Sequence, residues 1–120
     1  MRAMIYARTA VNDIEKLNWQ IEACKGFALG ADWTVIEVFT DLGQSGMERN
    51  RPGLQALFRA TLNGECDALL TTDMARLSRN LADQVEIQKV LQCDGVKLVT
   101  LFTPEGKISH DTSTGDGLIH

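Results

Sequence analysis

Four short apolar runs along the chain predict β-strands. They are bounded by turn residues and rich in β-branched and aromatic side chains, as strands usually are. The four runs are RAMIYA at 2–7, WTVIEVF at 33–39, CDALLTT at 66–72 and VKLVTLF at 96–102. A further short edge strand is predicted near Lys107 and Ile108, so the sheet should have four or five strands.

Between these runs, apolar residues recur at helical spacing and predict three helices. The first begins after residues 12–13, the second begins at Pro52, and the third follows the loop DMARLSR. Their expected ends are Gly30, Gly64 and Gly95, because glycine commonly ends a helix. The residues expected on the inner sides are Ile14, Leu17, Ile21, Cys24 and Ala28, then Leu54, Leu57, Phe58 and Leu62, then Leu81, Val85, Gln88 and Leu91 or Val90.

The order of these elements is βαβαβαβ. Such an order predicts an α/β fold with three layers, in which a mostly parallel sheet lies between helices. In sheets of this kind, ligands bind outside the carboxyl ends of the strands. The loops at that edge begin near Arg8, Asp41, Asp73 and Thr103. We therefore expect a functional site where these four loops meet.

Composition narrows the class of protein. A chain of 120 residues with 44% hydrophobic and 23% charged residues is expected to form one globular domain. It has neither a membrane-length apolar run nor a signal peptide, so we expect a soluble, cytoplasmic protein. Three scattered cysteines indicate reduced thiols, and with only two histidines we expect no histidine-based metal site. A net charge of -4 argues against strong nonspecific binding to nucleic acid.

Arginines gather in the loops at the expected site. Arginine suits bidentate contact with phosphate, because its planar guanidinium stays charged at any working pH. Four of them could surround a phosphodiester and stabilise charge on its oxygens: Arg8, Arg51, Arg76 and Arg79. Alternatively, they form solvated salt bridges, which are common on surfaces and contribute little to stability. The carboxylates available for such pairs are Asp41, Glu48 and Asp73.

Other candidates have ordinary interpretations beside the functional ones. Asp41 could organise the guanidiniums or act as a lone general base, or it could simply start a loop. Ser45 is one of many exposed loop serines. Trp19 and Trp33 are interpreted as packing residues rather than stacking platforms. The chain contains no GxGxxG or GKS/GKT sequence, so no known nucleotide-binding loop is predicted.

Three motifs, taken in order, resemble the catalytic domain of serine recombinases, the resolvases and invertases. They are YAR at 6–8, DLGQSG followed by RPGL at 51–54, and ARLSRN at 75–80. WQIEAC fits the first helix of that family, and KISHDTSTGDGL resembles the segment before its long C-terminal helix. The resemblance covers residues 1–120 as one resolvase-like catalytic domain, which ends before that helix and the family's DNA-binding domain.

The resemblance implies a site-specific DNA recombinase. In this family a serine two residues after the first arginine attacks the scissile phosphate and forms a 5′-phosphoserine link. Strands are then exchanged within a synaptic tetramer, without metal or nucleotide cofactor. The partner is DNA, and the dimers and tetramers of full-length members are an open question for this chain. By position, active-site roles are implied for Arg8, Asp41, Arg51, Arg76 and Arg79.

Two positions depart from the family's pattern. The nucleophile position is Ala10, whose methyl group cannot attack phosphorus. The aspartate that usually precedes the RLSR-type motif is replaced by Ala75, although Asp73 stands two residues upstream. Ala10 alone could be an engineered substitution, whereas two alanines at polar positions are equally consistent with natural divergence.

Other hydroxyls are poor replacements for the missing serine. Side chains alternate along a strand, so Thr9 is expected to point away from the face that Arg8 shares with Ala10. The resemblance assigns no nucleophilic role to Ser45 or Ser78. The sequence thus favours a recombinase catalytic domain that does not cleave DNA by the phosphoserine route. Two alternatives stay open: a pseudo-recombinase that binds DNA or regulates a partner, and an unrelated doubly wound domain that binds a small ligand.

Overall fold

The computed structural model describes residues 1–44 and 51–102. In that part of the chain the elements are β1 (Arg2–Thr9), α1 (Ile14–Gly30), β2 (Thr34–Leu42), α2 (Pro52–Leu62), β3 (Ala68–Thr71), α3 (Met74–Leu77), α4 (Leu81–Cys93) and β4 (Lys97–Thr100). The expected edge strand near 107–108 lies outside the described residues, as do Ser45, Glu48 and the loop near Thr103.

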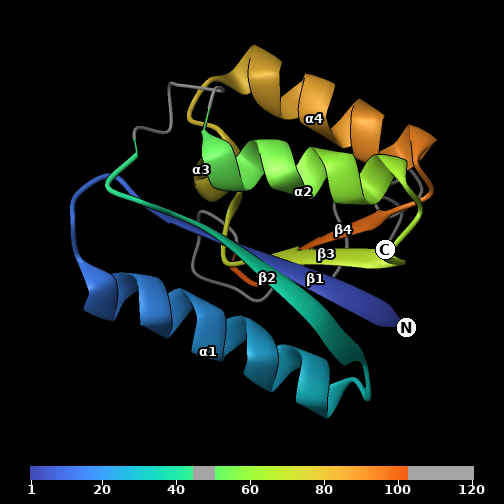
Figure 1. Cartoon of the computed structure of the whole chain (residues 1–120), viewed down its shortest axis with the longest axis horizontal. Coiled ribbons are helices and arrows are strands. Elements are labelled where there is room, and N and C mark those ends of the chain that lie inside the picture. The colour runs from blue at the N-terminus through green and yellow to red at the C-terminus, as the bar shows by residue number, and fades with distance from the viewer. Residues whose placement is uncertain (45–50, 103–120) are drawn as a thin grey trace.

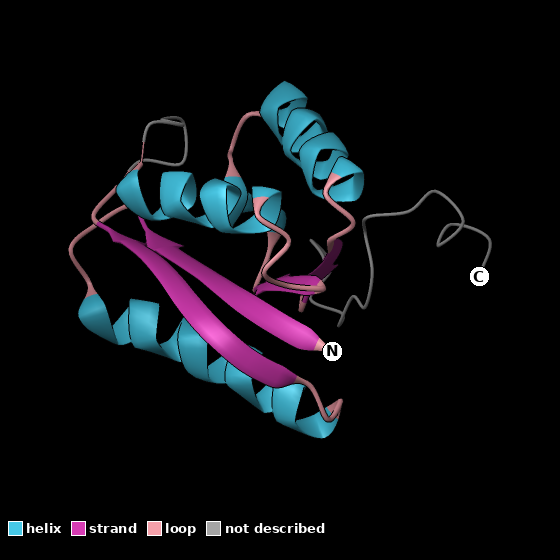
Figure 2. Ribbon diagram, turned by 45° about the vertical axis from the view of Figure 1, so that its right-hand side comes forward, coloured by secondary structure: helices cyan, strands magenta, loops and turns pink. Residues whose placement is uncertain are grey.

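The four described strands form one parallel sheet in the order β2-β1-β3-β4. Helix α1 covers one face of this sheet, while α2 and α4 cover the other (Figure 1). A second view shows the same three layers, with the sheet between the helices (Figure 2). The predicted α/β fold is therefore confirmed.

Two apolar clusters hold the layers together, one on each face of the sheet. Side chains of β1 point alternately to the two faces and so contribute to both clusters. Met4 and Tyr6 belong to the cluster beneath α2 and α4, whereas Ala3 and Ile5 belong to the cluster above α1. All four side chains are fully buried, as expected of a central strand covered on both faces. Arg8 follows on the same face as Tyr6, so the sheet itself directs this arginine toward the α2 and α4 layer.

Two expected boundaries were wrong near the site. The sequence placed Asp41 in a loop, but β2 continues to Leu42 because it stays paired with β1 up to Thr9. The segment DMARLSR, expected to be a loop, contains the short helix α3. In both cases pairing or packing with distant residues extended regular structure into a polar segment.

The inner side of α4 agrees only in part with the expected one. Leu91 is buried as expected, and Ile87 is buried as well, whereas Leu81 is 76% exposed and Val85 is 48% exposed. The Gln84 side chain donates a hydrogen bond of 2.7 Å to the Ser78 carbonyl, which turns this polar residue toward the preceding loop. A polar residue thus occupies a part-buried position near the start of the helix, which its apolar spacing alone did not predict.

Smaller differences occur at other helix ends. Ile14 and Leu62, expected to face inward, are 53% and 74% exposed, because each lies in a terminal turn. The predicted glycine stops are confirmed at Gly64 and Gly95, which adopt φ values of +72° and +75° just after α2 and α4. None of the helices in the described ranges is long and apolar enough to cross a membrane.

Burial of the cysteines gives a first testable prediction. Burial raises the pKa of the Cys24 thiol to about 12 and that of Cys66 to about 11, while Cys93 is exposed. Since the thiolate is the reactive form, one thiol per folded chain should react rapidly with a disulfide reagent near neutral pH. All three should react once the protein is denatured. Three fast equivalents in the native state would contradict the described packing.

The same pKa values predict how the free energy of unfolding depends on pH. Because both buried thiols have folded pKa values above their ordinary value of 9.0, they favour the folded state below about pH 9. Their contribution is lost as the pH rises through about 11 to 12. Urea titrations should therefore show a free energy of unfolding that falls over this alkaline range, and Cys24→Ala should reduce the slope.

Candidate functional site

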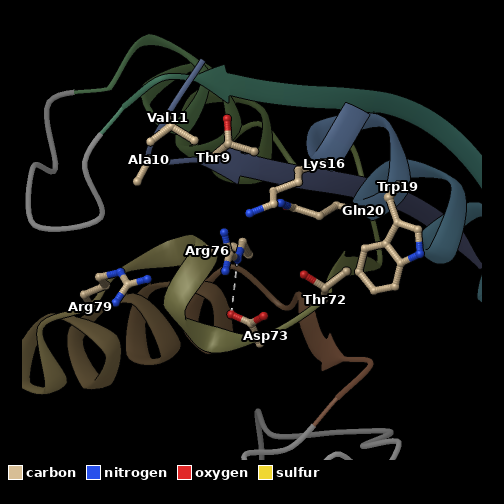
Figure 3. A pocket seen from close by; sticks show the side chains of 10 residues that line it. All are labelled: Thr9, Ala10, Val11, Lys16, Trp19, Gln20, Thr72, Asp73, Arg76 and Arg79. Atoms are coloured by element: carbon tan, nitrogen blue, oxygen red, sulfur yellow. Dashed lines mark hydrogen bonds and ion pairs between the residues drawn. The ribbon is translucent and has the colours of Figure 1, made fainter. Parts of the chain in front are cut away.

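A cavity of about 480 Å³ opens at the carboxyl ends of β1 and β3, where the sequence placed the functional edge. Helix α1 forms one wall, and α3 with the residues after it forms the other (Figure 3). The cavity is polar in character near α3, where Arg76, Arg79 and Asp73 line it, and it ends at Trp19 on the side of α1.

Of the four arginines expected to surround a phosphodiester, Arg76 and Arg79 line this cavity. The Arg76 Nε atom donates to the Asp73 carboxylate at 3.3 Å, and its Nη1 atom donates to the Arg8 carbonyl at 2.9 Å. Arg79 makes no hydrogen bond or ion pair within residues 1–44 and 51–102. The salt-bridge alternative therefore applies to Arg76 and Asp73, whereas Arg79 has no such pair among the described residues.

Ala10 lines the same cavity as these arginines, immediately after β1. Its exposed methyl group is seen at the end nearest Arg79 (Figure 3). The Thr9 hydroxyl, by contrast, accepts a long hydrogen bond of 3.4 Å from the Gly43 backbone N–H. Thr9 also lines the cavity, but it is buried, and this hydrogen bond directs its hydroxyl to the β2 side.

Arg8 does not line the cavity but lies fully buried behind it. Its guanidinium donates to three carbonyls: Gln44 at 2.7 Å, Ala75 at 2.8 Å and Arg76 at 3.0 Å. Burial, reinforced by the positive charges of Arg76 and Arg51, lowers the pKa of Arg8 to about 10. The side chain therefore stays charged at neutral pH and ties α3 to the end of β2.

Arg51 is also fully buried, on the far side of the α3 carbonyls. It donates to the Tyr6 hydroxyl at 2.8 Å, to the Arg76 carbonyl at 2.9 Å and to the Leu77 carbonyl. Its guanidinium carbon also lies 5.7 Å from the centre of the Tyr6 ring. Burial and the bond to Asp41 raise the pKa of Tyr6, so its hydroxyl remains a donor.

Asp41 fixes the start of α2. Its carboxylate accepts hydrogen bonds from the Gly53 and Leu54 backbone N–H groups at 2.8 and 2.9 Å, and from the Tyr6 hydroxyl at 2.7 Å. A carboxylate at a helix N-terminus binds otherwise unpaired N–H groups. A Cβ atom on Gly53 would clash with the Thr40 backbone carbonyl and lie 2.8 Å from the Asp41 carboxylate, so the glycine of RPGL permits this close approach.

The six site residues predicted from the sequence therefore divide into two groups. Ala10, Arg76 and Arg79 line the cavity, whereas Arg8, Asp41 and Arg51 lie behind it and hold its walls. Their catalytic roles stay predictions.

Sequence reasoning missed Gln20 and Lys16. Gln20 is buried and exchanges two hydrogen bonds with the backbone of Arg8, at 3.0 and 2.9 Å, which join α1 to β1. The one sequence signal for Gln20 was its position at helical spacing between the apolar residues Leu17 and Cys24. Lys16 lines the cavity from the first turn of α1. Within the described ranges, no group of three histidine, cysteine or acidic side chains could hold a metal ion.

Comparison with known proteins decides the family. The family model described as "Resolvase, N terminal domain" matches residues 3–120. This chain belongs to the serine recombinases. The resemblance read from the YAR, RPGL and ARLSRN motifs is thereby confirmed, and the chain is not an unrelated small-ligand module. No curated protein has a matching sequence.

Solved structures support the same family. The C-terminal catalytic domain of ISC1926 TnpA, an IS607-like serine recombinase, is 33% identical, with a TM-score of 0.82 over 89% of this chain and 71% of the other. The N-terminal catalytic domain of TP901-1 integrase is 27% identical, with a TM-score of 0.87 over 99% and 88%. A resolvase family site-specific recombinase from Streptococcus pneumoniae shares the fold at 23% identity, with a TM-score of 0.76 over 99% and 80%.

Proposed function

We propose that this recombinase domain binds the DNA backbone in the Ala10 cavity but does not cleave DNA by the phosphoserine route. The observation that carries the proposal is the position of Ala10, a methyl group on the wall of a cavity that Arg76 and Arg79 also line. The arginines can bind a phosphodiester, while no hydroxyl stands beside them at the position that the family uses for attack.

The buried groups support this proposal by keeping the cavity in shape. Arg8 and Arg51 both donate to the Arg76 carbonyl, at 3.0 and 2.9 Å, and so fix the backbone that carries one phosphate-binding side chain. Maintaining two buried guanidiniums is costly unless their donors are satisfied. The retained network therefore favours a binding role for the cavity over a decayed site. We place this activity in the cytoplasm, where DNA is accessible.

Two measurements on the wild-type protein test this proposal. Binding to a short fluorescent DNA duplex should be detectable at low ionic strength and weaken as salt is added, because phosphate contacts release counterions. The Arg79→Met variant should bind the same duplex more weakly than the wild type does at low salt. Incubation with supercoiled plasmid, followed by denaturation in detergent, should give no covalent protein–DNA adduct. An adduct mapped to Thr9 would overturn the claim that the domain does not cleave DNA.

Failure to bind DNA at low salt would favour the second candidate function. In that case the domain would act as a pseudo-recombinase that pairs with an active relative and regulates its assembly. Size-exclusion chromatography of this chain mixed with an active family member would then show a common complex.

A further prediction concerns Asp73, whose carboxylate is the only one on the described residues that line the cavity. It neutralises part of the Arg76 charge across 3.3 Å, so it opposes binding of an anion. Asp73→Asn should tighten DNA binding about 3- to 10-fold at low salt, as expected for loss of a partly exposed charge. Asp67→Asn makes the same change in net charge at the opposite end of β3, where Asp67 pairs with Arg2, and should have little effect. Equal effects of both variants would contradict a local role.

A further inference from the structure

We propose that Lys16 is a third phosphate-binding cation of this site and holds DNA from the α1 side of the cavity. The inference rests on the proposed DNA-binding function and adds a residue outside the three recombinase motifs. Arg76 and Arg79 would hold the same backbone from the α3 side. The phosphodiester would thus be bound between the two helical layers rather than by one loop.

The geometry of the cavity carries the proposal. Lys16 and Arg76 come from opposite walls and extend into the same space, with Ala10 at one end and Trp19 at the other (Figure 3). The Lys16 ammonium makes no hydrogen bond or ion pair within the described ranges, and the same holds for Arg79. Two cations that have no partner among the described residues therefore face a cavity large enough for a phosphate group.

The position of Lys16 on α1 gives an independent argument. Asp13 caps the helix and accepts from the Lys16 backbone N–H at 3.1 Å, so Lys16 is the third helical residue. Glutamate or glutamine is favoured there, and a cation near a helix N-terminus is opposed by the helix dipole. Local helix energetics thus disfavour this lysine. An anion bound in the cavity supplies the interaction that explains its presence.

The state of Arg76 explains why another cation is needed. Its Nε atom is engaged by Asp73 and its Nη1 atom by the Arg8 carbonyl, so much of its charge and donor capacity is already used. Lys16 offers three rotatable N–H donors on a flexible stem and can adapt to a phosphate held mainly by Arg79. Lys16 would therefore contribute affinity for the backbone of DNA without preference for base sequence.

The test compares Lys16→Met with Lys25→Met in the whole 120-residue chain. Lys25 is an exposed lysine on the same helix, paired with Glu22 at 3.7 Å, so both variants lose one positive charge from α1. Binding to a short fluorescent DNA duplex is measured by anisotropy over a series of salt concentrations. Lys16→Met should weaken binding about 3- to 10-fold at low salt and reduce the slope of log K against log salt by about 1. Lys25→Met should match the wild type, and Lys16→Arg should retain most of the affinity.

The outcomes separate this proposal from the one on which it rests. If Arg79→Met weakens binding while Lys16→Met behaves like Lys25→Met, the role of Lys16 is overturned and the DNA-binding function stands. If the wild type shows no salt-dependent binding, or Arg79→Met leaves it unchanged, the proposed function itself fails. Equal weakening by Lys16→Met and Lys25→Met would show a general effect of charge. It would also overturn the proposal that Lys16 binds phosphate in the cavity.

Discussion

Arg51→Met is expected to lower the free energy of unfolding by about 2–5 kcal/mol, since a hydrogen bond to a charged group contributes about 1.5–3 kcal/mol. The buried guanidinium donates to the Tyr6 hydroxyl and to the carbonyls of Arg76 and Leu77. Methionine fills a similar volume but supplies no donor, so the Leu77 carbonyl loses this partner inside the fold. Urea denaturation of wild type and variant measures the change directly.

A matched control lies on the same helix. Arg59 is exposed on α2, so Arg59→Met should change the free energy of unfolding by no more than about 0.5 kcal/mol. Arg51→Lys should fall between the two, because an ammonium keeps the charge but cannot reach the same set of acceptors. If Arg51→Met is as stable as Arg59→Met, the buried network does not hold α3 in place.

The largest functional change is expected from Ala10→Ser. The substitution adds one hydroxyl to the cavity wall beside Arg76 and Arg79. Its oxygen would lose its proton and form a bond to phosphorus as the P–O3′ bond breaks, and the leaving 3′ oxygen would take up a proton, which leaves a 5′-phosphoserine link. Loss of a catalytic nucleophile can reduce a rate by roughly 10⁶-fold, so the gain should be evident as a new adduct. The assay uses supercoiled plasmid carrying the genomic DNA that flanks the gene, with detergent-stable adducts mapped by mass spectrometry.

Two double variants identify the source of any adduct. Thr9→Val in the Ala10→Ser background should retain it, because the Thr9 hydroxyl is directed to the Gly43 backbone. Arg79→Met in that background should reduce it strongly, because the guanidinium is proposed to stabilise charge on the phosphate. DNA that is bound but not cleaved by Ala10→Ser would show that the site has lost more than its nucleophile.

Much of the fold was predictable because its signals are local. Strand composition, the Asp13 cap and the glycine stops each act over a few residues, and they gave the order of elements correctly. Leu81 and Val85 were wrongly expected on the inner side of α4, where the Gln84 side chain instead contacts Ser78, and apolar spacing does not report such a contact. The four-residue helix α3 was missed because it depends on Arg8 and Arg51, which donate hydrogen bonds to its carbonyls from distant parts of the chain.

The sequence by itself determined the family and the most informative position in the site. The spacing of YAR, RPGL and ARLSRN identified a recombinase, and the position two residues after Arg8 singled out Ala10. Both conclusions depend on residue order, which is contained in the sequence.

Only the tertiary structure decided what each arginine does. Arg8 and Arg51 are buried donors to the α3 carbonyls, whereas Arg76 and Arg79 line the cavity with Lys16. The acceptors of Arg8 include carbonyls 67 and 68 residues away along the chain. Which guanidinium faces solvent and which faces backbone depends on the packing of β1 against α3, and such long-range contacts leave no periodic pattern in the sequence.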